Sequence, residues 1–134
     1  MSAPAGFTEV VLTDPFEIHV GPAFAVGDGL ARRYGFRVEA HHCNLRGVVH
    51  GGMLMTLADL TLGQAVWAAT DFASVVTLNM QTQFLAPARA GDWIEVAPEL
   101  TRRTRGMVFM RGDFTVGGSV IMTAQSVWKL LGEG

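Results

Sequence analysis

The stretch NLRGVVHGGMLMTLADLTLGQAVWAA, residues 44–69, decides how this chain folds. Its second part, from Gly51 to Ala69, is a long apolar run in which Asp59 is the one charged residue. Apolar residues lie on nearly every side of a helix drawn through this run, so other structure must wrap around it. The run approaches the length of a membrane span, but an ionised Asp59 at mid-bilayer costs about 2.5–3.5 kcal/mol on insertion scales. We therefore predict a helix buried in a protein core.

Segments in which polar and apolar residues alternate lie on both sides of this helix, as expected for strands with one buried face. One precedes the helix and four follow it, at residues 34–40, 74–84, 93–102, 107–116 and 119–131. Gly117-Gly118 predicts a hairpin between the last two strands, and Pro98 predicts an edge or an irregular position. The order predicts a single α+β domain in which a meander of antiparallel β-strands wraps around one long central helix.

Bulk composition narrows the classes of function. The 134 residues carry a formal net charge of −2, which gives no basic field for nucleic acid. Cys43 is the single cysteine, which excludes an internal disulfide and suits the cytoplasm, and the first residues lack a secretory pattern. With 49% hydrophobic and 16% charged residues, a monomer would expose much apolar surface, which hints at oligomerisation. We expect residues 1–30 to form an irregular N-terminal segment.

Two glycines at the start of the predicted helix expose backbone amides. The first N–H groups of a helix lack internal partners, and the helix dipole makes this end partly positive. Gly51 and Gly52 can present these amides to a carbonyl oxygen that turns negative during attack, where one donor is worth about 2.7–4 kcal/mol. The alternative is that the glycines only cap the helix or permit a tight turn.

Asp59 is the most informative residue of the stretch. No cation lies at helical neighbour spacing from it, and a buried carboxylate needs a partner or a function. It fits a general base or a nucleophile whose pKa is raised by burial, and a hydrogen bond to Thr56 or to a sheet backbone is the structural alternative. His50 and Asn44, which precede the helix, fit either chemistry or simple roles in a cap and a turn.

The spacing of these residues constrains any shared chemistry. Gly51 and Asp59 are eight positions apart, which places them roughly 12 Å from each other along one helix axis. One aspartate side chain cannot span that gap to a carbonyl held at the helix start. If both residues act on one atom, they come from two helices, so we expect a site shared across a two-fold interface of a homodimer.

The motif N-L-R-G-V-V-H-G-G at 44–52, followed by A-D at 58–59, resembles the PaaI-like (phenylacetate-pathway type) hotdog-fold acyl-CoA thioesterases. FLAPARAGD at 84–92 resembles a strand end and turn of the same family. The resemblance implies a hotdog fold, dimers with a continuous sheet that usually pair into homotetramers, and hydrolysis without a metal or a cofactor. The implied substrate is an aryl- or medium/long-chain acyl-CoA, of which coenzyme A is a part.

The resemblance also implies a role for each matching residue. Asn44 and Gly51 hold and polarise the thioester carbonyl, and His50 lies near the departing sulfur. Asp59 reaches in from the neighbouring subunit to activate water or to attack directly, and Thr77 orients the water.

Coenzyme A carries phosphates, so the mouth of such a site needs cations. Arg102, Arg103 and Arg105 cluster at a predicted hairpin turn and are the first candidates, together with the amide of Gly52. A solvated basic turn is the alternative for these arginines. Further candidates are Arg46 and Arg89 for the phosphates, and Phe36, Met53, Met55, Trp67 and Phe84 for an acyl pocket, although these last five also fit a plain core.

The sequence is also compatible with other activities. A hotdog enoyl-CoA hydratase or dehydratase also pairs a histidine with an acid across subunits, but its proline near the catalytic histidine is absent here. A non-catalytic acyl-CoA-binding protein needs neither Asp59 nor bare glycine amides. A metal on His41, His42 and Cys43 is disfavoured because adjacent strand residues point to opposite faces, and a hydrolase built on Cys43 and His50 is set aside as well.

Overall fold

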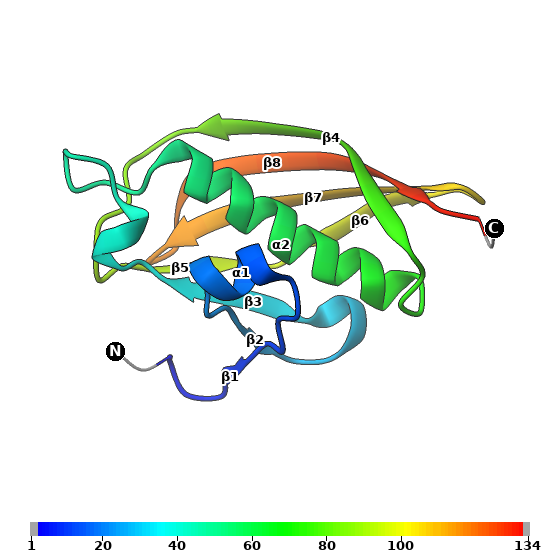
Figure 1. The fold of residues 1–134 in the computed structure, drawn as a ribbon, viewed down its shortest axis with the longest axis horizontal. Helices are drawn as coiled ribbons and strands as arrows, with labels where there is room; N and C mark the ends of the chain where they lie inside the picture. The colour runs from blue at the N-terminus through cyan, green and yellow to red at the C-terminus, as the bar shows by residue number, and fades with distance from the viewer. Residues whose placement is uncertain (1–2, 133–134) are drawn as a thin grey trace.

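The computed structural model describes residues 3–132, in which one long helix, α2, lies along a curved antiparallel sheet (Figure 1). Helix α2 runs from Gly51 to Ala69, as the sequence predicts. The other elements, in chain order, are β1 (Thr8–Glu9), α1 (Pro15–Val20), β2 (Phe24–Val26), the 3-10 turn η1 (Gly29–Ala31), β3 (Arg33–Arg37), the 3-10 turn η2 (Ala40–His42), β4 (Val75–Phe84), β5 (Trp93–Val96), β6 (Glu99–Arg103), β7 (Met107–Val116) and β8 (Ser119–Leu130).

The order of strands in the sheet is β1-β2-β3-β5-β7-β8-β4, and β6 pairs with β7 beside this path. The predicted meander is therefore wrong at one point, because β4 pairs with β8 and not with its neighbour in sequence, β5. This placement extends the sheet around a second flank of α2, whose apolar residues need cover on more than one side. It also makes β4 an edge strand, ten residues long.

The predicted hairpin at Gly117-Gly118 is confirmed between β7 and β8, and both glycines have the positive φ that tight hairpin turns need. The segment predicted as one strand at 93–102 is two strands, β5 and β6, which pair with successive parts of β7. The break falls at Pro98, which has no N–H to donate to a ladder. The strand predicted over 34–40 ends early, at Arg37, because η2 begins at Ala40.

The N-terminal segment, expected to be irregular, instead contains β1, α1, β2 and η1. Helix α1 begins after Asp14, whose side-chain oxygen accepts hydrogen bonds from the N–H groups of Phe16 and Glu17. Its last carbonyl, that of Val20, lies 2.7 Å from Nε2 of the buried His42. The helix is thus fixed at both ends, and it lies beside the first half of α2, where both helices line one cavity (Figure 1).

The core lies between α2 and the sheet. The largest side chains that are fully buried there include Tyr34, Phe36, Phe114 and Leu57. Gly63, inside α2, allows a close approach to the sheet, because a Cβ added there would lie 3.0 Å from the ring of Trp128. Within residues 3–132, no helix combines the length and the apolar character that crossing a membrane requires.

Candidate active site

The start of α2 leaves one backbone amide without a partner. His50 is the residue that caps the helix, and its ring Nδ1 accepts a hydrogen bond of 2.9 Å from the N–H of Gly52. Among residues 3–132, no group accepts the N–H of Gly51. The amide predicted to polarise a carbonyl is therefore free, whereas the Gly52 amide is occupied by His50 and is not available to coenzyme A. Because Nδ1 of His50 accepts, its Nε2 carries the proton and remains a donor.

Asn44 shapes the loop that leads into this helix start. Its side-chain oxygen accepts hydrogen bonds from the N–H groups of Arg46, at 2.9 Å, and Val48, at 3.4 Å. The N–H of His50 donates to the carbonyl of His42, which ties the end of the loop to η2. The turn-forming role of Asn44 is confirmed, and its side-chain amide remains able to donate to a substrate. We call Asn44, His50 and Gly51 the Gly51 half-site.

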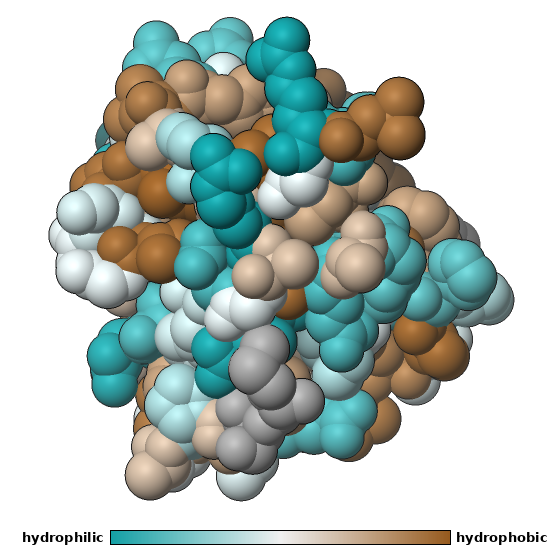
Figure 2. Space-filling model, turned by 90° about the vertical axis from the view of Figure 1, so that its left-hand side faces the viewer, coloured by the Kyte–Doolittle hydropathy of each residue, from teal (hydrophilic) through white to brown (hydrophobic). Residues whose placement is uncertain are grey.

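An apolar cavity of roughly 390 Å³ lies beside the Gly51 half-site. Its walls come from the loop, from α2 and from the end of β4, and they include Val48, Leu54, Phe84 and Leu85. A Cβ added to Gly51 would lie 3.5 Å from the ring of Phe84, an ordinary contact. Figure 2 looks onto this end of the molecule, where apolar patches lie between polar side chains. The unpartnered amide thus borders a space that suits an apolar substrate group.

Asp59 is exposed on α2 and accepts a hydrogen bond of 2.7 Å from the hydroxyl of Thr77 on β4. No cation among residues 3–132 pairs with Asp59. The hydrogen bond depends on a β-bulge, since Thr77 pairs with Trp128 while Asn79 pairs with Val127, leaving Leu78 as the extra residue.

The bulge at Leu78 corrects the alternation expected along β4. A regular strand would place Thr77 and Met80 on opposite faces. The extra residue shifts the register by one, so that Thr77 reaches Asp59 while Met80 packs against the core. Both side chains therefore face α2.

Glu17, on α1, is a residue that sequence reasoning missed at this site. It lines a cavity of roughly 300 Å³ together with Asp59, Met55 and Met80. Burial raises the pKa of Glu17, and the nearby carboxylates of Asp14 and Asp59 raise it further. The one available signal was Asp14-Pro15, a cap followed by proline, which is a typical helix start. We call Glu17, Asp59 and Thr77 the Asp59 half-site.

The structure does not bring the two half-sites together within one chain. Gly51 and Asp59 lie on the same helix, eight residues apart, which corresponds to roughly 12 Å along its axis. Each chain therefore carries donors in one place and a carboxylate in another. This geometry agrees with the spacing argument from the sequence.

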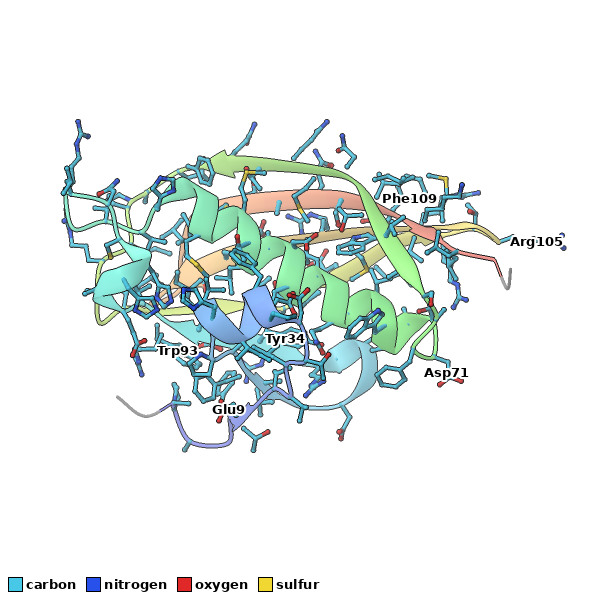
Figure 3. All side chains as sticks on the ribbon, viewed as in Figure 1. Glu9, Tyr34, Asp71, Trp93, Arg105 and Phe109 are labelled. Atoms are coloured by element: carbon cyan, nitrogen blue, oxygen red, sulfur yellow. The ribbon has the colours of Figure 1, made fainter. Side chains whose placement is uncertain are left out.

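The three arginines predicted for coenzyme A have different surroundings. Arg103 donates from Nη1 to the carbonyl of Ala69, at 2.5 Å, and so caps the C-terminal end of α2. This contact gives Arg103 a structural role within one chain, and its contact with a phosphate stays a prediction. Arg102 and Arg105 are exposed, and Arg105 lies at the end of the molecule opposite the start of α2 (Figure 3).

Arg46 and Arg89 lie closer in the chain to the Gly51 half-site. Arg46 belongs to the loop that Asn44 closes, and Arg89 forms an isolated bridge with Val48 of the same loop. Both are exposed. Within one chain, these two arginines are therefore better placed than Arg102 and Arg105 to bind a phosphate near the Gly51 half-site.

The residues proposed for an acyl pocket divide into two groups. Phe36 and Met53 are buried in the core, as the alternative interpretation expected. Met55 and Phe84 are partly exposed and line the two cavities described above. Trp67 is also partly exposed, but it belongs to the last turn of α2, away from both half-sites.

His41 and His42 do not lie in a strand, so the reason predicted against a metal site there is wrong. Residues 40–42 form η2 and not a strand, so the side chains of Glu39, His41 and His42 come together, with possible ligand atoms within 4.8 Å. However, Nδ1 of His42 accepts from the N–H of Glu39 at 3.0 Å, and its Nε2 donates to Val20. Burial also lowers the pKa of His42. Both nitrogens of His42 are thus engaged, and it has no lone pair for a metal.

Comparison with known proteins decides the family. The sequence model of the Thioesterase superfamily matches residues 46–123, which contain both Gly51 and Asp59. The chain belongs to the Thioesterase superfamily. This thioesterase is 31% identical over 132 residues to PA0474, a Pseudomonas aeruginosa protein that carries an esterase name, and the match covers 97% of this chain and 98% of that one.

Two further similarities concern the enzyme class and the fold. Acyl-coenzyme A thioesterase 13 of Mus musculus is 26% identical over 98 residues, which cover 73% of this chain and 64% of the mouse protein. A variant of the phenylacetic acid degradation protein PaaI from Thermus thermophilus has the same fold, with a TM-score of 0.78 at 23% identity, over 88% of this chain and all of that one. The protein is a thioesterase with the hotdog fold that the PaaI protein also has, and its chemistry is the hydrolysis of a thioester.

Proposed function

We propose that this thioesterase hydrolyses the thioester of an aryl- or medium/long-chain acyl-CoA, at a site shared by two subunits. The Gly51 half-site of one subunit holds the carbonyl, and the Asp59 half-site of its partner delivers the nucleophile. The observation that carries the proposal is the free N–H of Gly51 in one place and the Thr77-bonded carboxylate of Asp59 in another. The name of the mouse relative supports coenzyme A as the thiol.

The edge strand β4 offers a way to bring the half-sites together. It carries no charged residue and no proline, and it is exposed along most of its length, with Leu78 and Phe84 each 52% exposed. An uncharged edge of this length is a template for pairing with another strand. A second copy of β4, added antiparallel, would continue the sheet across a two-fold axis.

The register of such a pairing can be derived from the two half-sites. Thr77 bonds Asp59, and Phe84 lies beside Gly51. A two-fold axis between Met80 and Gln81 would place residue 77 of one subunit opposite residue 84 of the other. Because both helices would then lie on the same side of the joined sheet, Asp59 of each subunit would face Gly51 of its partner.

The chemistry follows from the donors and acceptors. The N–H of Gly51, at the positive end of α2, and the side-chain amide of Asn44 stabilise the negative charge that forms on the carbonyl oxygen. Asp59 removes a proton from water as the water oxygen attacks the carbonyl carbon. Alternatively, the carboxylate of Asp59 attacks that carbon itself, and water then hydrolyses the resulting anhydride to release the acid. The Thr77 hydroxyl donates to Asp59, and its oxygen can accept from the same water. When the carbon–sulfur bond breaks, Nε2–H of His50 can donate to the departing thiolate.

The phosphates of coenzyme A require cations near the mouth of this shared site. Arg46 and Arg89 flank the loop of the Gly51 half-site, and Arg102 and Arg105 remain unpaired with carboxylates among residues 3–132.

We propose a homodimer as the minimal active unit and a homotetramer as the assembled enzyme. The single cysteine, Cys43, supports a cytoplasmic location.

Thiol release from a panel of aryl and aliphatic acyl-CoAs tests the proposal, with Asp59→Asn as the inactive control. We expect release from several members of the panel by the unmodified protein and near-background release by the variant. Hydration of an enoyl-CoA without thiol release would contradict the proposal and indicate a hydratase. Binding of acyl-CoA without any turnover would contradict it in favour of a binding protein.

A further inference from the structure

The cavity beside Asp59 has one wall that comes from the N-terminal segment and not from the central helix or the sheet. Phe16 and Glu17 of α1 line it opposite Met55, Asp59 and Met80. The volume, roughly 300 Å³, is at the lower end of the range typical of small-molecule sites. Whatever part of a substrate enters this cavity contacts α1.

Hydrogen bonds hold both ends of helix α1, although it has only six residues. Asp14 accepts the N–H groups at its start, and the N–H of Gly21 donates to the carbonyl of Glu17 at its end. His42 binds the carbonyl of Val20 from within the core. Glu17 is therefore presented to the cavity by a braced element.

Glu17 brings a negative charge that nothing nearby balances. Among residues 3–132, its carboxylate has no ion pair and no hydrogen-bonded side chain. It is only partly exposed, and the charged groups that act on it are the carboxylates of Asp14 and Asp59. The cavity thus combines apolar surface from Phe16, Met55 and Met80 with the negative charges of Glu17 and Asp59.

We propose that Glu17 is a specificity-determining residue, which makes this cavity accept uncharged acyl groups and reject acyl groups that end in a carboxylate. This inference rests on the proposed function. A carboxylate that entered the cavity would meet like charge in a partly desolvated space, and like-charge contact is an effective means of rejecting a wrong ligand. The apolar side chains contact an uncharged chain of the same length without that penalty.

A matched pair of substrates tests this inference. Hexanoyl-CoA and adipyl-CoA carry six-carbon acyl groups and differ in the terminal carboxylate. We expect the unmodified enzyme to prefer hexanoyl-CoA, and we expect Glu17→Gln to raise the relative kcat/KM for adipyl-CoA by about tenfold or more. Glu9→Gln, which changes an exposed carboxylate on β1, is the matched control and should leave the ratio of the two kcat/KM values unchanged.

A second measurement uses the unmodified enzyme and does not depend on the folding of any variant. Added salt screens like-charge repulsion, so the preference for hexanoyl-CoA should decrease between low and high ionic strength. An unchanged ratio in Glu17→Gln and in high salt, with hexanoyl-CoA still cleaved, would overturn the role of Glu17 and leave the proposed function standing. Failure of the unmodified enzyme to cleave any acyl-CoA would overturn both.

Discussion

The Gly51 half-site offers hydrogen-bond donors beside an apolar wall, whereas the Asp59 half-site offers carboxylates and a hydroxyl. The first is built on the rigid loop that Asn44 closes and on the start of α2. The second is built where three separate elements, α1, α2 and β4, meet. Both lie on the same helix, yet neither contains the groups that the other supplies.

This difference is the reason that we propose a site built from two copies of the chain. On α2 the donors need the N-terminal end, because only there do the backbone N–H groups of a helix lack internal partners. The carboxylate needs a neighbour that can orient it, and Thr77 on β4 provides that neighbour in the middle of the helix. A helix of 19 residues cannot place both at one point, and in the proposed dimer a second copy supplies the missing half.

The largest expected effect comes from removing the acid of the Asp59 half-site. Asp59→Asn keeps the shape and an acceptor for Thr77 but cannot take a proton or attack, so we expect kcat to fall by about 10²–10⁴-fold. The Gly51 half-site should still bind substrate, so affinity for a non-hydrolysable acyl-CoA analogue should persist. Asp71→Asn, an exposed acid just beyond α2, is the control and should retain activity. Comparable activity in Asp59→Asn and the control would contradict the assignment.

The donor of the Gly51 half-site can be removed without unfolding the helix. Proline is tolerated at the first position of a helix, and the extended backbone of His50, with φ −61° and ψ 136°, suits a residue before proline. Gly51→Pro should therefore fold and lower kcat by about 10²–10³-fold, the cost of losing one such donor. Gly51→Ala keeps the N–H and adds a Cβ in ordinary contact with Phe84, so it should lose far less. Equal losses in the two variants would indicate crowding and not a lost hydrogen bond.

A smaller effect is expected from the group that orients Asp59. Thr77→Val removes the hydroxyl and keeps the shape of the side chain. A hydrogen bond to a charged group is worth about 1.5–3 kcal/mol, so kcat should fall by about 10- to 100-fold. Thr77→Ser restores the hydroxyl and should recover most of the activity. Full activity in Thr77→Val would remove Thr77 from the mechanism.

The smallest expected effect is a pH-dependent change in thermal stability. A substitution of Glu17 in the Asp59 half-site should cause it, and a substitution in the Gly51 half-site should not. Below pH 4.5, the ordinary pKa of glutamate, Glu17 is protonated in both the folded and the unfolded chain. As the pH rises, the unfolded chain loses this proton first because the folded-state pKa is raised, so Glu17 increasingly destabilises the fold.

Glu17→Gln should therefore raise the melting temperature slightly at pH 7–8, and this gain should disappear toward pH 4. Thermal unfolding of both proteins across this pH range provides the measurement. Gly51→Ala, in the other half-site, should show no such pH dependence relative to the unmodified protein. A gain that is constant with pH would mean that the Glu17 charge has no part in it.

Local patterns in the sequence were sufficient for several features of the fold. The apolar run and its glycines predicted α2 from Gly51 to Ala69, and Gly117-Gly118 predicted the β7–β8 hairpin. Each of these signals lies within the element that it specifies. The position of β4 beside β8 depends on distant parts of the chain, and no local pattern reports it.

In the candidate site too, local sequence indicated the residues, whereas their arrangement depends on the folded structure. The sequence predicted Gly51, Asn44, His50, Asp59 and Thr77 as a set, and the structure shows which groups are free to act. Only the orientation of the His50 ring distinguishes the free amide of Gly51 from the occupied amide of Gly52. The contact between Thr77 and Asp59 depends on the bulge at Leu78, a residue whose type is ordinary for a strand.

Glu17 could not be found from its neighbours in sequence. Its short helix has a recognisable start at Asp14-Pro15, but its position beside Asp59 comes from tertiary packing and from the bond between His42 and Val20. A six-residue helix carries too little periodicity to be detected by pattern alone.

The most direct test of the shared site is complementation between two inactive chains. Asp59→Asn and Gly51→Pro chains are co-expressed in equal amounts and their thiol release is compared with that of each variant alone. In a mixed dimer, one site carries both defects and the other is intact, so the mixture should recover about a quarter of the unmodified activity. Activity in the mixture no higher than in the separate variants, with mixed dimers shown to form, would contradict a site built from two subunits.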